Sequence, residues 1–180
     1  MTGLQPALGA GFGCGTIVGM DSLRPRRSVL FMPGANARAL EKARSIDCDG
    51  IIIDLEDAVA PDLKVEARER AAGVVKEHPY GYREVAIRVN GMDTQWYHDD
   101  LAAAVAAGPD AIAVPKVGSA EHVHAIVADM EAAGADESVK LWAMIETPRA
   151  VLDCLDIAEA SDRLTVLIMG TNLSLIHISD

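Results

Sequence analysis

The sequence predicts an α/β fold of the (β/α)₈ TIM-barrel type, with only about six of the eight βα units present. Short apolar strands recur roughly every 25–35 residues, and each is followed by a stretch of helical periodicity. Nearly every strand ends in polar side chains, as the ligand-binding edge of a parallel sheet does. No G-x-G-x-x-G motif follows the first strand, which disfavours a dinucleotide-binding fold. An open doubly wound sheet remains an alternative.

The predicted elements alternate along the chain. The strands are apolar runs closed by a polar residue or glycine, and they cover residues 26–32, 50–57, 84–91, 111–116, 140–146 and 164–170. The helices that follow begin near a capping residue, a proline or a periodic apolar position, at Asn36, Pro61, Tyr97, Ser119 and Thr147. The last of these helices shows apolar residues at helical spacing, namely Ala150, Val151, Leu152 and Leu155.

Composition limits the classes of function. The chain has 180 residues, half of them apolar, and a formal net charge of -11, which suits one core and argues against nucleic-acid or membrane partners. Cys14, Cys48 and Cys154 are odd in number and widely spaced, so we expect neither a disulfide framework nor a cysteine metal site, and a reducing cytoplasm is the simplest setting. Residues 1–23 are expected to be a disordered extension, and Met20 is an alternative start.

Charged residues at the strand ends are expected to converge on one rim of the sheet, and they are Glu56, Asp57, Arg88, Lys116 and Glu146. Carboxylates suit a hard cation such as Mg²⁺, and an arginine fork binds a carboxylate bidentately. Together they suit carbon–carbon bond chemistry on a keto acid, in which charge develops on oxygen. No lysine lies at an apolar strand centre, so a Schiff-base aldolase is the weaker variant.

Each of these residues also has a purely structural interpretation. Glu146 could cap the helix that follows it, and Glu56 and Asp57 could cap the loop after their strand. Arg88 could pair with a neighbouring carboxylate, and Lys116 could cover a loop. The sequence leaves these alternatives open.

Five motifs carry a resemblance to a known family. They are Arg26-Arg27-Ser-Val-Leu-Phe-Met-Pro-Gly-Ala-Asn, Ile-Asp-Leu-Glu-Asp-Ala-Val-Ala-Pro, Ile-Arg-Val-Asn-Gly, Val-Pro-Lys-Val and Ile-Glu-Thr-Pro. In this order, between about Arg24 and Asn172, they resemble the citrate lyase beta-subunit and malyl-CoA lyase group of the HpcH/HpaI aldolase superfamily. The resemblance implies a Mg²⁺-dependent barrel enzyme that cleaves or forms a 3-hydroxyacyl-CoA thioester of the malyl, citramalyl or citryl type, usually as a homotrimer or homohexamer.

The resemblance also implies roles for individual residues. Arg88 would bind the substrate carboxylate, Glu146 would ligate Mg²⁺, and Glu56 and Asp57 would support the water shell of the metal. The remaining substrate-binding positions would be Lys116 on the rim and, near the CoA arm, Arg27, Phe31 and Pro33.

The chain departs from the family pattern after Asn172. Leu173 stands where the family has an aspartate, the second Mg²⁺ ligand, and residues 173–180 resemble no barrel unit, so His177 is interpreted as incidental. We therefore expect a partial barrel domain over residues 24–172, and no lyase activity from the chain as printed. The alternatives are a class II metal-dependent aldolase acting on free 2-keto acids, and a non-catalytic subunit or carrier-binding module.

Overall fold

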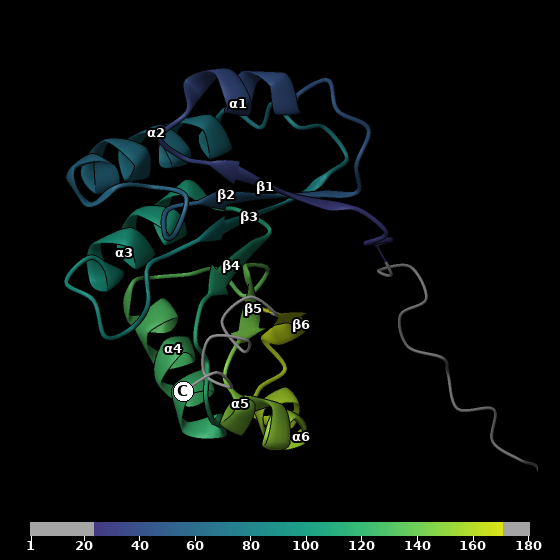
Figure 1. Cartoon of the computed structure of the whole chain (residues 1–180), viewed down its shortest axis with the longest axis vertical. Helices are drawn as coiled ribbons and strands as arrows, with labels where there is room; N and C mark the ends of the chain where they lie inside the picture. Colours follow the sequence, from purple (N-terminus) through teal and green to yellow (C-terminus); the bar gives the residue numbers. More distant parts are fainter. Residues whose placement is uncertain (1–23, 171–180) are drawn as a thin grey trace, which may run out of the picture.

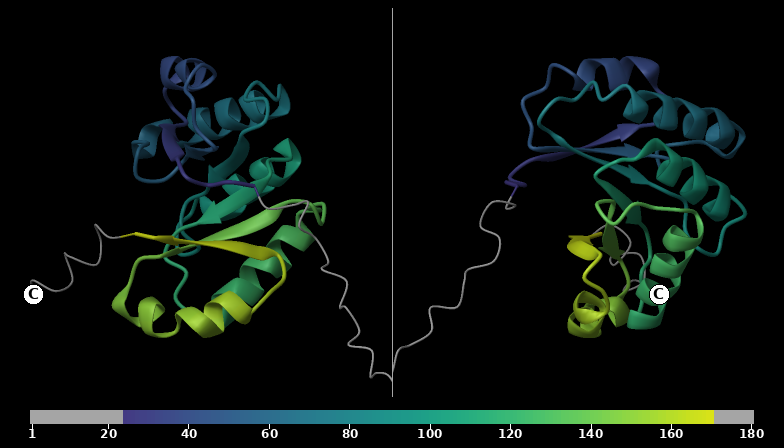
Figure 2. Two further views of the ribbon diagram at one scale, coloured as in Figure 1. Left: turned by 90° about the vertical axis from the view of Figure 1, so that its right-hand side faces the viewer. Right: turned by 180° about the vertical axis from the view of Figure 1, so that it is seen from behind.

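The computed structural model describes residues 24–170, which form parallel strands joined by helices. The sheet has six strands in chain order, each parallel to its neighbour. Helices line one side of the sheet (Figure 1), and Figure 2 shows the same layering from two further directions. This is the arrangement of consecutive βα units in a barrel, so the predicted fold class is confirmed.

The described elements lie close to their predicted positions. The strands are β1 (Val29–Pro33), β2 (Gly50–Asp54), β3 (Glu84–Arg88), β4 (Ala111–Val114), β5 (Lys140–Ile145) and β6 (Leu164–Met169). The helices are α1 (Ala37–Ala43), the 3₁₀ turn η2 (Pro61–Leu63), α2 (Lys64–Lys76), α3 (Tyr97–Ala107), α4 (Ala120–Ala132), α5 (Pro148–Leu152) and α6 (Cys154–Glu159). Several strands end before the polar residues that were assigned to them, because those residues already belong to the turns that follow.

The two faces of the sheet carry different cores. Successive strand residues point to opposite faces, so Ile51 and Ile53 pack with the helices while Ile52 points to the other side. Trp142 lies on that inner side, packed in a small cluster with alanines from β3 and β4. Small residues beside one indole allow neighbouring strands to curve toward each other, as the interior of a barrel requires.

Two predicted capping residues, Ser119 and Thr147, cap their helices, and Asn36, near which a helix was expected to begin, is a cap as well. Asn36 accepts a hydrogen bond from the Ala39 amide at 3.1 Å, and Ser119 caps α4 through the amide of His122. Thr147 accepts from the Ala150 amide at 3.1 Å. These side chains satisfy backbone donors that a first helical turn leaves unpaired.

The helix after Thr147 differs from the prediction. It breaks at Asp153, whose φ of −93° and ψ of 14° interrupt the helical path, and continues as α6. The predicted apolar face is therefore buried only at Ala150: Leu152 is 81% exposed and Leu155 is 67% exposed. The spacing indicated the helix correctly but not the direction in which its apolar residues point.

Three arginines before β1 bind acidic residues at the starts of other strands. Arg24 pairs with an aspartate before β4 and Arg26 with a glutamate at the start of β3. Arg27 donates to both oxygens of Asp49, which precedes β2, at 2.7 and 3.0 Å. The segment before β1 is thereby tied across the base of the sheet, the end opposite the rim.

The predicted extension, residues 1–23, lies outside the described residues, and so does the tail that contains Leu173 and His177. Within residues 24–170, no helix is both long and apolar enough to cross a bilayer.

The tie between Arg27 and Asp49 predicts a stability difference with a defined pH window. The hydrogen bonds from Arg27 lower the pKa of the Asp49 carboxyl to about 2. Because this pKa lies below the ordinary value of about 4, the carboxylate stabilises the fold above pH 4, and this stabilisation is lost toward pH 2. Asp49→Asn should therefore melt below the wild type at pH 7, and the gap should shrink between pH 4 and pH 2. The exposed Asp162→Asn is the control, and a gap independent of pH would refute this account.

Candidate active site at the strand ends

The charged residues predicted for the rim do meet at one end of the sheet. Because all strands are parallel, the residues that follow β2, β3, β4 and β5 emerge on the same side (Figure 1). Four residues form a connected group there through short contacts, with Glu146 joined by the backbone amide of Lys116, and they are Glu56, Arg88, Lys116 and Glu146. Asp57 lies at its exposed margin, with a carboxylate oxygen 3.5 Å from Nη1 of Arg88.

Arg88 is bound by a carboxylate that sequence reasoning did not select. Its Nε and Nη2 donate to the two oxygens of Asp54, each at 2.7 Å. Both residues are buried, and they face each other in the β2–β3 register. Asp54 also accepts from the backbone amides of Glu56 at 2.8 Å and Ala58 at 3.0 Å. The sequence did contain a signal for this pair: Asp54 ends a run of three isoleucines in β2, and Arg88 ends β3.

This pairing changes the expected mode of action of Arg88. The fork that was predicted to hold a substrate carboxylate is occupied by Asp54, as the structural alternative anticipated. The remaining nitrogen, Nη1, lies 3.0 Å from Oε2 of Glu56, and the guanidinium carbon lies 5.1 Å from the ring centre of Phe31. Arg88 therefore presents one edge, rather than its bidentate fork, toward the rim.

Glu56 lies between two cations and is itself largely buried. Its Oε1 accepts from Nζ of Lys116 at 3.1 Å, while Oε2 is close to Arg88 but not aligned for a hydrogen bond. Burial raises the pKa of the Glu56 carboxyl, although the hydrogen bond from Lys116 and the charge of Arg88 act in the opposite direction. A carboxyl with a raised pKa at a strand end is suited to proton transfer.

Lys116 connects the carboxylates after β2 and β5. Its backbone amide donates to Oε2 of Glu146 at 3.0 Å, and its side chain reaches Glu56. It does so from a φ of +55°, a left-handed conformation that a lysine adopts rarely. The pKa of Lys116 is raised: partial burial opposes the charge, but the hydrogen bond and charge of Glu56 outweigh it. Strain held by surrounding contacts is frequent at functional sites.

Glu146 is buried at the end of β5, against the backbone at the end of β6. A Cβ on Gly170 would lie 2.5 Å from Cγ of Glu146, so only glycine leaves room for this carboxylate. Within residues 24–170, no group of three or more His, Cys, Asp or Glu side chains could hold a metal ion alone. Glu146 fits as one ligand of Mg²⁺, which takes one or two protein carboxylates and completes its shell with water and substrate oxygens.

The residues predicted near a CoA arm separate into two groups. Phe31, 44% exposed, lies against Arg88, and Pro33 ends β1 opposite Asp54 in the strand register. Arg27 lies at the other end of β1, bound to Asp49, so the structure does not bring it to the rim.

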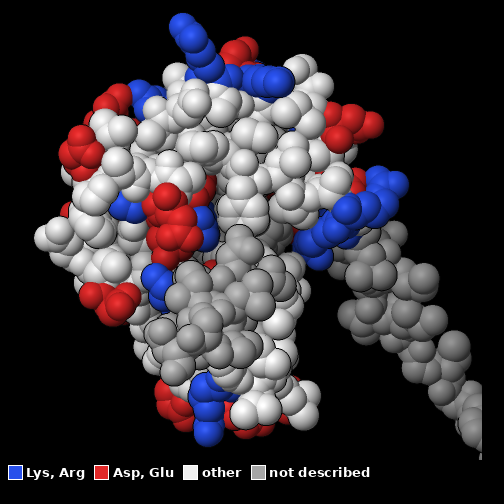
Figure 3. All heavy atoms as spheres, in the orientation of Figure 1, with Lys and Arg blue, Asp and Glu red and all other residues white. Residues whose placement is uncertain are grey.

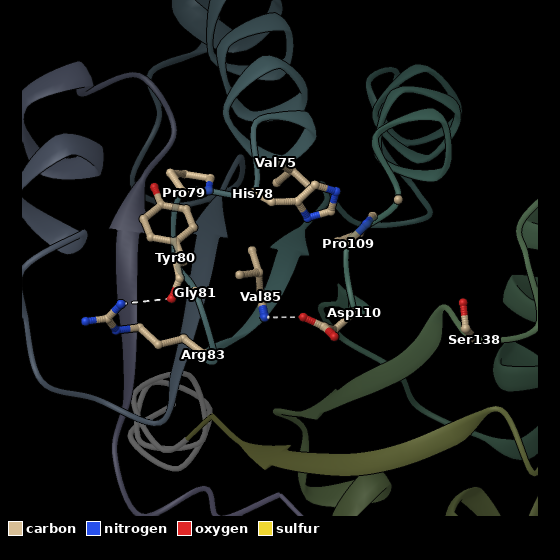
Figure 4. Close-up of a pocket in the computed structure, with 11 residues that line it drawn as sticks. Val75, His78, Pro79, Tyr80, Gly81, Arg83, Val85, Pro109, Asp110 and Ser138 are labelled. Atoms are coloured by element: carbon tan, nitrogen blue, oxygen red, sulfur yellow. Dashed lines mark hydrogen bonds between the residues drawn. The ribbon is translucent and has the colours of Figure 1, made fainter. Parts of the chain in front are cut away.

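Two cavities can be compared with this rim. One, of about 380 Å³, opens beside Lys116 and is also lined by Met92, Asp93, Pro115 and His122. Another, of about 190 Å³, lies among the loops at the base of the sheet (Figure 4). There Arg83 donates to the Tyr80 carbonyl and Asp110 accepts from the Val85 amide, so the main polar groups are already satisfied. The rim is therefore a better candidate for the active site than the cavity at the base.

Acidic residues outnumber basic ones in the chain, which has a formal net charge of -11. Figure 3 shows acidic and basic side chains interspersed over one face of the molecule. A small anionic ligand would therefore be recognised by individual cations of the rim, and not by a broad basic surface.

Comparison with known proteins identifies the family. The profile of the HpcH/HpaI aldolase/citrate lyase family matches residues 27–173. The chain belongs to this family. It is 49% identical over 148 residues to the (3S)-malyl-CoA thioesterase of Cereibacter sphaeroides and 36% identical over 152 residues to the citrate lyase subunit beta of Escherichia coli K12. Each match covers 82% of this chain and 50% of the relative, so the chain spans about half the length of these relatives.

Solved structures agree with this assignment. RipC from Yersinia pestis matches with a TM-score of 0.66 and 30% identity, over 85% of this chain and 61% of that one. The citrate lyase beta subunit of Mycobacterium tuberculosis, complexed with oxaloacetate and magnesium, matches with a TM-score of 0.64 and 25% identity, over 84% and 60%. Both similarities support the arrangement of strands and helices described above.

The Asp54–Arg88 pair predicts a large cost for removing one charge. Asp54→Asn leaves the buried guanidinium without its bidentate carboxylate, with Glu56 as its remaining buried partner, and should lower the free energy of unfolding by up to about 3–5 kcal/mol. Asp57→Asn is the matched control, because that side chain is 68% exposed, and it should change the free energy by about 0.5 kcal/mol or less. Urea unfolding of both variants measures the difference. Equal losses would show that the buried pair has no special role.

Proposed function

We propose that this protein is a Mg²⁺-dependent carbon–carbon lyase that cleaves or forms a 3-hydroxyacyl-CoA thioester of the malyl, citramalyl or citryl type, with acetyl-CoA and a 2-keto acid as the other partners. The observation that carries the proposal is the connected group of Glu56, Arg88, Lys116 and Glu146 at the carboxyl ends of the strands. Family membership and the magnesium and oxaloacetate complex of a structural relative support it.

The reaction class explains why these residue types are needed together. In the cleavage direction, the hydroxyl on the carbon β to the thioester loses its proton and becomes a carbonyl. The bond between the α and β carbons breaks, and its electron pair forms the enolate of acetyl-CoA, which then takes up a proton. Negative charge therefore develops on oxygen and must be stabilised in place.

The cations of the rim lie where they can meet this charge. Nη1 of Arg88 and Nζ of Lys116 are each within 3.1 Å of Glu56, so a ligand that approaches the carboxylate also approaches both cations. Glu56, with its raised pKa, is the group best suited to hold or release a proton there. Asp57 would orient the ligand from the exposed side. Phe31 and Pro33 offer apolar contact for the CoA arm.

Mg²⁺ would be held by Glu146 and by oxygens of the keto acid, and when bound it supplies positive charge to the keto oxygen. Among the described residues, Glu146 is the buried carboxylate beside the Lys116 amide that would ligate the metal. The Lys116 amide fixes one oxygen of Glu146, and the close approach of Gly170 limits where the carboxylate can move.

A second candidate function is hydrolysis of the thioester bond. It is favoured by the 49% identity to a protein named (3S)-malyl-CoA thioesterase. The two reactions give different products from malyl-CoA. A lyase produces acetyl-CoA and glyoxylate, whereas a thioesterase produces malate and free CoA.

A chimera tests turnover, because the chain spans about half of its relative. Residues 27–172 would replace the matching half of the Cereibacter sphaeroides protein. We expect acetyl-CoA to form from malyl-CoA only with Mg²⁺ present. Glu146→Gln should lower this rate by at least about 10²-fold through loss of the metal ligand. The exposed Glu131→Gln on α4 should leave it unchanged.

The product decides between the candidates when CoA species are separated by chromatography. Free CoA without acetyl-CoA would favour the thioesterase. A chimera that forms acetyl-CoA equally well with and without Glu146 would refute the proposed site.

A further inference from the structure

Lys64 is a buried lysine that the proposed chemistry does not use. It is the first residue of α2 and is only 5% exposed. Both features disfavour a cation: burial removes its hydration, and the amino end of a helix carries partial positive charge. Burial accordingly lowers the pKa of Lys64, although the negative charges of Asp54, Asp100 and Glu56 oppose the shift. A residue kept in such a place must make compensating contacts.

Those contacts converge on the turn that carries Glu56. Nζ of Lys64 donates to the carbonyl oxygens of Leu55 and Glu56 and to Oδ1 of Asn90, each at 2.7 Å. All three ammonium protons therefore have an acceptor. The ammonium also lies 5.4 Å from the ring centre of Trp96, which covers it.

The turn after β2 is thus held from two sides by opposite charges. Asp54 binds its amides, at Glu56 and Ala58, while Lys64 binds its carbonyls, at Leu55 and Glu56. The backbone is thereby held on both sides of Glu56, whose side chain projects toward Arg88 and Lys116 on the rim. This restriction matters because a small displacement of the Glu56 carboxylate would lengthen its contacts with both Arg88 and Lys116.

The support of Lys64 extends to two helices. Asn90, which accepts from Lys64, donates to the Leu55 carbonyl and to the fully buried Asp100. Asp100 in α3 is in turn bound by Nε of Arg68 in α2 at 2.6 Å. This buried network connects the turn to both helices, so movement of the turn would break several hydrogen bonds together.

We propose that Lys64 is a positioning residue, which fixes the β2–η2 turn so that the Glu56 carboxylate is held between Arg88 and Lys116. The role assigned to Glu56 rests on the proposed function, but the fixing of the turn does not. Lys64 touches neither the reacting atoms nor the metal site, and acts through the backbone of residues 55 and 56.

Amide hydrogen exchange in the 180-residue chain tests the proposal with Lys64→Met, which keeps an unbranched side chain as far as Cε and removes the ammonium. Exchange at the Glu56 and Ala58 amides should become at least about tenfold faster, while exchange in β4 stays at the wild-type rate. Lys76→Met, an exposed position at the end of the same helix, is the matched control and should change neither. If the methionine variant does not fold, Lys64→Gln is judged by the same criterion.

Two exchange patterns would overturn the proposal. Unchanged exchange at Glu56 and Ala58 would show that the turn does not depend on Lys64. Equally faster exchange throughout the sheet would show a general contribution to stability instead of positioning.

Binding of oxaloacetate with Mg²⁺, measured by calorimetry, separates this proposal from the proposed function. If the wild type binds, Lys64→Met should bind about tenfold more weakly and Lys76→Met equally well. Equal affinity of Lys64→Met and the wild type would overturn the positioning role. If the wild type does not bind, the proposed function is judged by the chimera, and the exchange pattern still decides the role of Lys64.

Discussion

The ion pair between Arg88 and Asp54 is the interaction on which the rest of the site depends. It joins β2 to β3 at their last paired residues, and it is buried. Removing two charges from water is costly, and the cost is offset only when geometry is good and the remaining hydrogen-bonding capacity is used. Here the fork is bidentate, and Asp54 accepts two further backbone amides. The pair thereby sets both the direction of Arg88 and the path of the turn that bears Glu56.

The two ends of the sheet use charge differently. At the base, arginines before β1 bind acidic residues at the starts of β2, β3 and β4, and each cation has its own carboxylate. At the rim, Glu56 is shared by Arg88 and Lys116, and burial raises the pKa of its carboxyl. An ion pair in which each charge has its own partner stabilises the fold. A carboxylate such as Glu56, which is shared by two cations, can still bind a ligand or exchange a proton. This contrast supports placing the chemistry at the rim.

Much of the fold was predictable because it depends on local pattern. Apolar runs of strand length, the caps at Ser119 and Thr147, and polar strand ends are all visible in the sequence. What could not be predicted depends on contacts between distant residues. The partner of Arg88 follows from strand register, and the burial of Lys64 follows from the approach of Asn90, 26 residues further along the chain. Arg27 was placed near the ligand by resemblance, whereas its neighbours in space hold it at the base.

A double-mutant cycle on Asp54 and Arg88 tests the central claim most directly. The free energies of unfolding of Asp54→Asn, Arg88→Met and the double variant would be compared with the wild type. If the pair organises the turn and the rim, the double variant should lose at least about 2 kcal/mol less than the sum of the single losses, because either single change leaves a buried charge without its bidentate partner. Additivity within about 0.5 kcal/mol would show that the two residues act independently and would contradict the account.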